Sequence, residues 1–423
     1  MLRQVRARAV VVLAATVVVS SLVTAPTVVG RPAESVASRY VAVDPTRLVD
    51  TRDTGTPLGE GASLPIDLAD RVPADATAVV VNLTADAPTQ PGYLTVYPAD
   101  AARPETSSLN KRAGETRSNA VTVALPSSGS RLVSVFNQAG TTQVVVDLFG
   151  YYVPTTSASS EAASYYPFSS PFRALDSRSG ARIGPTGGAA IVLPSPAGVS
   201  GVVAVAVNLT AVDPTGPGYL TAWAGGDLPR PAVSNVNYGY DAATPNSAVV
   251  PAYQDGDGIH FTVANSVGVT DVLVDVAGLY AAAGGADATA YVPVPPTRLT
   301  DTRGNGTTLG PSGTVDTVVP AAEGDLPRAA NVNVTAVGAT VPTYVSVYPS
   351  DVDRPGVSTL NPAVGQAVPN AAQTLLSAGG AFRVFNYSGA VDVVADLQGY
   401  FVRDGGDVIT PLPQPTGAAA TTW

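Results

Sequence analysis

Short apolar runs alternate with turn residues along most of the chain. In one representative stretch they fall at 76–85, 92–99, 118–125, 131–138 and 142–152, which read ATAVVVNLTA, GYLTVYPA, SNAVTVAL, RLVSVFNQ and TQVVVDLFGYY. The runs are rich in β-branched residues and are separated by Gly, Pro, Asn or Asp, which is typical of β-strands joined by turns. They lack the 3.6-residue apolar period of a helix. We therefore expect an all-β protein built from antiparallel β-sandwiches, of which the jelly roll is one form.

The pattern occurs three times. Asp50, Asp176 and Asp301 are 126 and 125 residues apart, and the asparagines of VNLTA, VNLTA and VNVTA keep the same two spacings. Small polar residues between the copies have the composition of flexible connectors. We predict a signal peptide at 1–37, three tandem β-sandwich modules at 40–153, 164–282 and 289–403, and a flexible tail at 404–423.

The N-terminus has the layout of an export signal. Arg3, Arg6 and Arg8 precede an apolar run of signal-peptide length, and small residues such as Ala25 follow it. A retained N-terminal anchor is the alternative, although about twenty unbroken apolar residues are expected for one. We predict a secreted, extracellular protein with no membrane span once the signal is cleaved.

The composition excludes cysteine chemistry and argues against some classes of binding partner. The chain has no cysteine, which excludes disulfides, thiolate metal sites and cysteine nucleophiles, so each module must be held by its core. Residues 1–37 hold four arginines and one glutamate, so 19 basic and 32 acidic side chains remain without them. An acidic surface of this kind is a poor match for nucleic acid or anionic lipid.

Each module opens with a charged element, RLVDTR, RALDSR or RLTDTR. In the first copy an extended backbone would place Asp50 and Arg52 on one face, about 6.6 Å apart. The closing strand directs Asp147 away from its apolar face, so we predict that Arg47 or Arg52 meets Asp147 across neighbouring strands. The expected network comprises Arg47, Asp50, Arg52, Asp147, Arg173, Asp176, Arg178, Asp275, Arg298, Asp301, Arg303 and Asp396.

We interpret this network as a structural brace, because bidentate Arg–carboxylate pairs fix geometry without adding much net stability. The alternative is a pair of catalytic carboxylates, as in a glycosidase. A general acid needs a raised pKa, whereas adjacent arginines lower the pKa of a carboxyl group.

Other catalytic or metal chemistry has little support in the sequence. His260 is the only histidine and has no counterpart in the other copies, which favours an ordinary half-buried strand residue. The turn with Asp255 and Asp257 is oxygen-rich but lacks the ligand spacing of an EF-hand, which favours a tight turn over a calcium site. No nucleophile elbow, zinc-ligand pair or phosphate loop is found. We predict no enzyme activity, no cofactor and no metal.

One strand per module, GYLTVYP in the first copy, carries aromatic residues on either side of a hydroxyl. Two such rings, about 13 Å apart, could stack on sugar rings. Packing of the rings beneath a loop or a linker is the alternative. The candidate binding residues are Tyr93, Tyr97, Tyr219, Trp223, Tyr344 and Tyr348.

The asparagines of the VNLTA-type runs match the glycosylation acceptor pattern but lie in the middle of apolar strands. We therefore expect Asn82, Asn208 and Asn333 to be buried amides that hydrogen-bond within each sandwich.

The motifs resemble those of tandem repeats in secreted proteins of high-GC actinobacteria. The resemblance rests on the RLxDTR opening, the N[LV]TA strand, GYLTVYP, the RP…SxLN segment and the VD[LV]xGY[YF] close, and it covers about residues 40–403. The middle copy departs most, with FRALDSR, YLTAWAG and VAGLY. The resemblance implies extracellular accessory modules and brings no catalytic residues with it.

From these observations we predict a non-catalytic secreted or cell-surface repeat protein. Its modules would bind a glycan, the cell wall or a partner protein through repeated weak contacts, because linked copies of one weak site raise the effective concentration. The alternatives are a secreted hydrolase that acts on polysaccharide through aspartate carboxylates, and a purely structural spacer.

Overall fold

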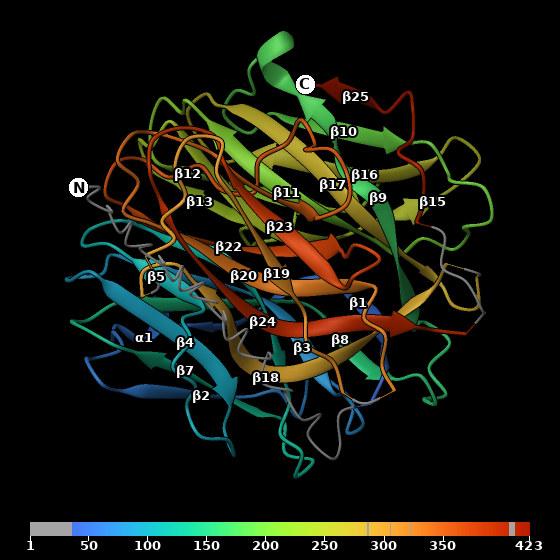
Figure 1. Cartoon of the computed structure of the whole chain (residues 1–423), viewed down its shortest axis with the longest axis horizontal. Coiled ribbons are helices and arrows are strands. Elements are labelled where there is room, and N and C mark those ends of the chain that lie inside the picture. Colours follow the sequence, from blue (N-terminus) through green and yellow to red (C-terminus); the bar gives the residue numbers. More distant parts are fainter. Residues whose placement is uncertain (1–35, 286, 305, 323, 406–410) are drawn as a thin grey trace, which may run out of the picture.

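The computed structural model describes residues 36–285, 287–304, 306–322, 324–405 and 411–423, so the predicted signal peptide at 1–37 lies almost wholly outside the described residues. The described chain is almost entirely β-strand, with antiparallel pairing between its named strands. The strands fall into three sets with one topology (Figure 1). The predicted all-β, antiparallel fold class is confirmed.

Strand set 1 contains β1–β8 in two antiparallel sheets. The inner sheet has the order β1-β8-β3-β6 and the outer sheet the order β2-β7-β4-β5, which is the strand order of a jelly roll. The strands are β1 (Ser38–Asp50), β2 (Ser63–Asp67), β3 (Ala78–Asp86), β4 (Gly92–Pro98), β5 (Leu109–Lys111), β6 (Arg117–Ala124), β7 (Leu132–Asn137) and β8 (Gln143–Pro154).

Strand set 2 repeats this order with β9-β17-β11-β14 inside and β10-β16-β12-β13 outside. A short additional strand, β15, pairs with β16. The strands are β9 (Ala163–Asp176), β10 (Gly188–Leu193), β11 (Ala204–Val212), β12 (Gly218–Trp223), β13 (Val236–Tyr238), β14 (Ala243–Pro251), β15 (Tyr253–Gln254), β16 (Ile259–Asn265) and β17 (Asp271–Ala282).

Strand set 3 has β18-β24-β20-β22 inside and β19-β23-β21 outside. An isolated bridge from Val345 to Leu360 takes the place of the fourth outer strand. The strands are β18 (Thr289–Asp301), β19 (Thr314–Val318), β20 (Ala329–Val337), β21 (Val345–Pro349), β22 (Ala367–Leu375), β23 (Ala381–Asn386) and β24 (Asp392–Arg403). Whether each set folds on its own stays a prediction.

The central inner strands are buried on both faces. On β3, Val79, Val81 and Leu83 pack into the core between the two sheets of set 1, while Val80 and Asn82 are also buried on the opposite face. The opposite face is covered because the three inner sheets pack against one another. This double burial explains why these strands are nearly continuous apolar runs instead of alternating with exposed polar residues.

The three first strands meet at the centre of the molecule. Their starts form bridges from Ser38 to Tyr291, from Tyr40 to Ala163 and from Thr289 to Tyr165. A buried aromatic cluster surrounds this point, and it includes Tyr40, Phe149, Tyr152, Tyr165, Tyr280, Tyr291 and Phe401. The three sets therefore share one core in addition to their own.

The repeated glycine of each closing strand has a steric cause. A Cβ at Gly150 would lie 2.3 Å from the Tyr40 ring, and the same clash occurs between Gly278 and Tyr165. Tyr40 also donates to the Phe149 carbonyl at 2.7 Å. Only glycine lets the first-strand tyrosine lie this close to the closing strand.

The C-terminal segment corrects the prediction of a flexible tail. Residues 419–422 form β25 (Ala419–Thr422), which pairs antiparallel with β10 along Ala189–Val192. Figure 1 shows β25 in red beside the green β10. Leu412 is also buried, and it forms a bridge with Phe168. The tail binds here because the edge of β10 carries neither proline nor charge, whereas β2 has Pro65 and β19 has Asp316.

Candidate functional site

The Arg–Asp network lies where the first strand of each set ends. In set 1 the Asp50 carboxylate caps the helical turn α1 (Thr51–Thr54) by accepting the backbone N–H of Arg52 at 3.1 Å. The Arg52 guanidinium binds Asp50 as well, through Nε at 2.8 Å and Nη2 at 2.6 Å. Residues 51–54 are therefore helical instead of extended as predicted, because the cap starts a turn directly after Asp50.

Arg47 links the two carboxylates of the network. Its Nε and Nη2 donate to Asp147 at 2.7 and 3.3 Å, and its Nη1 donates to Asp50 at 2.9 Å. Arg47 and Asp147 are direct partners in the register of β1 and β8. The structure thus brings Asp147 to Arg47, while Arg52 remains with Asp50. The same arrangement recurs in set 2 with Arg173, Asp176, Arg178 and Asp275, and in set 3 with Arg298, Asp301, Arg303 and Asp396.

The two carboxylates of each copy have different electrostatic surroundings. Hydrogen bonds from Arg178 lower the pKa of Asp176 to about 2. Asp275 is only 3% exposed, and burial raises its pKa while hydrogen bonds from Arg173 oppose that rise. The more accessible carboxylate is therefore a poor proton donor, and the buried one is shielded from any substrate.

Asparagines tie neighbouring sets together. Asn82 donates from Nδ2 to the Ser234 carbonyl at 2.6 Å and accepts from Asn246 Nδ2 at 2.9 Å. The backbone of Ser234 also hydrogen-bonds to Asp147, so the Arg–Asp network borders the same contact. The equivalent residues at the other two contacts are Asn208 with Ser358 and Asn370, and Asn333 with Ser107 and Asn119. We call each of these three contacts between sets a joint.

The joints correct the prediction that these amides bond within one sandwich. Asn82 and Asn333 are at most 3% exposed, as a buried amide requires, but their partners belong to the next set. The reason is that both faces of the inner sheet are buried, so residues directed away from the sandwich core meet another set instead of solvent.

Two of the six rings predicted to form aromatic platforms, Trp223 and Tyr348, are buried. Thr95, between Tyr93 and Tyr97, is fully buried and donates to the Thr106 carbonyl in the covering loop at 2.8 Å. Trp223 is 9% exposed and donates its indole N–H to the Leu228 carbonyl. Tyr348 is 3% exposed. Trp223 and Tyr348 are therefore too buried to form an open sugar platform, and the loop after β12 covers Trp223.

The same loops place arginines over the outer sheets. Arg103 lies 3.7 Å above the Phe136 ring, and Arg354 lies 4.5 Å above the Phe385 ring. Both arginines belong to the RP…SxLN segments, whose recurrence is visible in the sequence. The rings on which they stack lie in strands distant in sequence, so the contact itself could not be predicted. Such cation–π contacts stabilise the loop against the sheet.

The other four candidate rings are at least partly accessible. Tyr219 is 42% exposed and lies 5.4 Å from the Arg230 guanidinium. Tyr344 stacks on Tyr387 with ring centroids 4.6 Å apart and an interplanar angle of 15°. Tyr387, which the sequence interpretation did not include, is 52% exposed. Tyr93 and Tyr97 are half-buried.

The His260 region is a turn stabilised by its own side chains. Asp255 Oδ1 accepts the backbone N–H groups of Asp257 and Gly258 at 2.9 and 3.2 Å, and it lies 2.8 Å from His260 Nε2. The His260 ring stacks on Tyr253 at 4.8 Å. Among the described residues no group of three His, Cys, Asp or Glu side chains could hold a metal ion.

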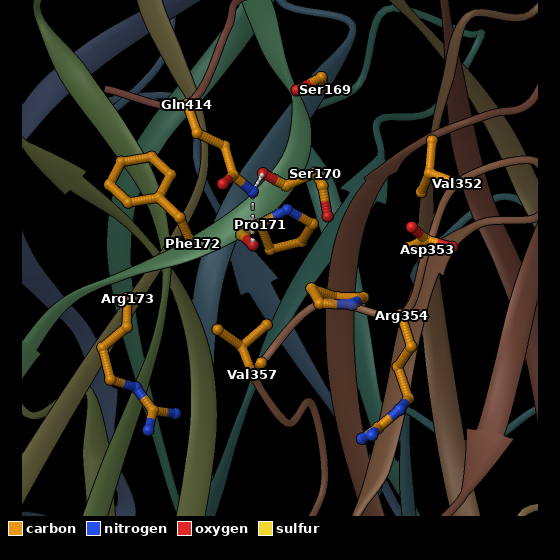
Figure 2. A pocket seen from close by; sticks show the side chains of 12 residues that line it. Ser169, Ser170, Pro171, Phe172, Arg173, Val352, Asp353, Arg354, Val357 and Gln414 are labelled. Carbon is orange, nitrogen blue, oxygen red and sulfur yellow. Dashed lines mark hydrogen bonds between the residues drawn. The ribbon is translucent and has the colours of Figure 1, made fainter. Parts of the chain in front are cut away.

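Each joint also has a surface cleft. The cleft between sets 2 and 3 measures about 490 Å³ and lies between residues 169–173 of β9 and the loop 352–357 (Figure 2). The side-chain amide of Gln414 reaches over it from the C-terminal segment and donates to the Ser170 carbonyl at 3.0 Å. Figure 2 shows Arg173 and Arg354 on opposite sides of this cleft.

Comparisons with known proteins give little further guidance. No family model and no curated protein matches the chain. Among solved structures, one match is described as "The Triple Jelly Roll Fold and Turret Assembly in an Archaeal Virus"; it is 9% identical and covers 87% of this chain and 92% of that chain, with a TM-score of 0.18. A TM-score this low carries no argument about function. The described residues contain no helix that is both long and apolar enough to cross a membrane.

Proposed function

We propose that this chain is a secreted or cell-surface, non-catalytic protein that binds glycan, cell wall or a partner protein. The observation that supports this most directly is the internal use of its repeated charged motif. In all three copies the Arg–Asp network links the first strand of the set to its closing strand beside a joint. One carboxylate of each copy is at most 3% exposed.

The distribution of aromatic rings supports binding at the surface. Tyr387 offers an exposed ring face, and Tyr344 stacks behind it. Arg354 Nη1 donates to the Tyr344 hydroxyl at 2.5 Å, which fixes the orientation of that ring. A rigid pair of rings suits the C–H face of a sugar and loses little conformational entropy on binding.

A hydrolase that uses the aspartates gains no support from this geometry, since the carboxylate with the raised pKa is buried in each copy. A purely structural spacer is the second candidate. The hydrogen-bonded joints favour it, because they would give a rigid body instead of a flexible string of modules.

Retention on insoluble polysaccharide tests the proposal. The chain without residues 1–37 should be retained on peptidoglycan, and Tyr387→Ala should lower retention at least threefold, because it removes the exposed ring. Tyr240→Ala is the matched control, because it also removes an exposed tyrosine ring, which is 78% exposed. It should leave retention unchanged. A protein that passes through peptidoglycan, chitin and cellulose without retention would favour the spacer.

A further inference from the structure

The three joints have equivalent asparagine contacts, but different side chains fill the space beside these contacts. Two residues after the buried aspartate, the closing strands carry Phe149, Ala277 and Gln398. Phe149 packs in the shared apolar core together with Val249 of the next set. Gln398 accepts the backbone N–H of Thr122 at 3.2 Å. Ala277 is too short to fill the equivalent space between sets 2 and 3.

A cavity results at that joint. It has a volume of about 40 Å³, against about 10 Å³ at the joint that contains Phe149. Ala206 adds to the difference, because the equivalent residue is Val80 in set 1 and Asn331 in set 3. The walls are mostly apolar and include Ala206, Ala277, Val347 and Val357. The space exceeds what about one water molecule requires.

One polar residue of the cavity wall has a side-chain atom without a hydrogen-bond partner in the described part of the chain. Gln373 is 9% exposed, and its Nε2 donates to the Tyr280 hydroxyl at 2.9 Å. Its Oε1 is buried and finds no hydrogen-bond partner among the described residues. A buried acceptor without a donor is costly, so the cavity is suited to a ligand that brings an N–H or O–H group.

The cavity lies directly behind the cleft of Figure 2, since Pro171 and Val357 line both. This cleft is also the largest of the three, at about 490 Å³ against about 320 and 190 Å³. The chain of β9 between the paired residues Pro167 and Phe172 is one residue longer than that of β1 between Ala42 and Thr46. Set 2 therefore has a wider bulge in β9 and a small residue, Ala277, where the other sets have a large side chain.

We propose that this cavity receives the acetamido group of an N-acetylated sugar whose ring lies in the cleft. An acetamido group has a methyl, which fits the walls formed by Ala206 and Ala277, and an N–H, which can donate to Gln373 Oε1 once the Gln373 amide turns that buried atom toward the cavity. Thr359 also lines the cavity, and its hydroxyl, which accepts the Val347 N–H at 3.1 Å, still has a proton to donate to the acetamido carbonyl oxygen. The inference rests on the proposed glycan-binding function and assigns it a ligand class and a place.

Calorimetric titration of the chain without residues 1–37 tests this site. Tetra-N-acetylchitotetraose should bind, and cellotetraose, which lacks acetamido groups, should bind at least tenfold more weakly. Ala277→Gln brings in the residue found at the Gln398 position and should weaken binding of the acetylated probe at least tenfold. Ala206→Val, which copies Val80 of set 1, is a second and smaller filling variant in case Ala277→Gln does not fold.

The controls separate this inference from the proposed function. Tyr240→Ala removes an exposed ring that lines neither the cavity nor the cleft, and it should keep the affinity for the acetylated probe. Folded filling variants that bind the probe like the parent, equal binding of both probes, or no binding of the acetylated probe would each overturn the cavity site. If the parent is still retained on peptidoglycan in those cases, the general binding function stands; if it is not, both fail.

Discussion

At the residue scale, the paired aspartates of the networks in sets 2 and 3 differ in burial more than in partners. Asp275 is 3% exposed and is held by two hydrogen bonds from Arg173, while the side chain of Asp176 is 27% exposed and is held by Arg178 and Arg173. Removal of one charge from a buried ion pair leaves the other charge without a counterion. In an accessible pair, water can solvate the remaining charge.

We therefore expect Asp275→Asn to destabilise the protein by about 2 to 3 kcal/mol, because Arg173 is 23% exposed and keeps Asp176 as a partner. Asp176→Asn should cost only about 1 kcal/mol after allowance for solvent screening. Chemical denaturation of both variants measures the two values. An Asp275→Asn protein as stable as the parent would contradict the brace.

The same network predicts a pH dependence. Because the pKa of Asp176 is lowered from 3.8 to about 2, its contribution to stability is complete above about pH 4 and is lost as the pH falls toward 2. Asp301 behaves in the same way. The double variant Asp176→Asn/Asp301→Asn should therefore lose less stability than the parent between pH 4 and pH 2. Equal losses in that window would show that the two carboxylates are not stabilised in the native state.

At the element scale, β25 protects an edge. The outer sheet of set 2 would otherwise expose β10, whose sequence GAAIVL offers no proline or charge against pairing with another chain. Pro65 in β2 and Asp316 in β19 provide such protection in the other two sets.

Removal of residues 411–423 should accordingly cause concentration-dependent association, visible by light scattering. Ala190→Lys in the truncated chain should restore the monomer, because Ala190 lies between the core residues Ala189 and Ile191 and is itself only half-buried. A truncated protein that stays monomeric without the lysine would show that the edge needs no cover.

At the scale of the whole molecule, we expect the joints to make the three sets unfold as one cooperative body. The asparagine contacts and the central tyrosine cluster would hold the sets together even where the chain between them is cut. This differs from the sequence interpretation, in which mobile connectors separate independent modules.

Limited proteolysis distinguishes the two descriptions. Cleavage near residues 155–162 or 283–288 should give a nicked protein that elutes at the size of the intact chain on native size exclusion and separates only in denaturant. Fragments that separate under native conditions would mean that the joints are weak. If the joints hold the sets together, calorimetry of the nicked protein should show a single thermal transition.

The fold class and the threefold repeat follow from the amino-acid sequence without any tertiary information. Alternating β-branched runs with turn residues between them specify strands locally, and the spacings of Asp50, Asp176 and Asp301 reveal three copies of one pattern. Alternation along the strands also placed Asp147 on the opposite face of its strand from Val146 and Leu148. These properties depend on a few neighbouring residues, so they can be read from the chain directly.

What packs against each face of a strand depends on the tertiary structure. Asn82 looks like an amide of its own sandwich until the next set supplies the Ser234 carbonyl, and Trp223 looks exposed until its loop covers it. Ala277 carries no local sign of function, because the cavity beside it is defined by side chains from two different sets. Contacts between distant segments depend on how whole sheets pack, and no periodicity along one strand encodes that packing.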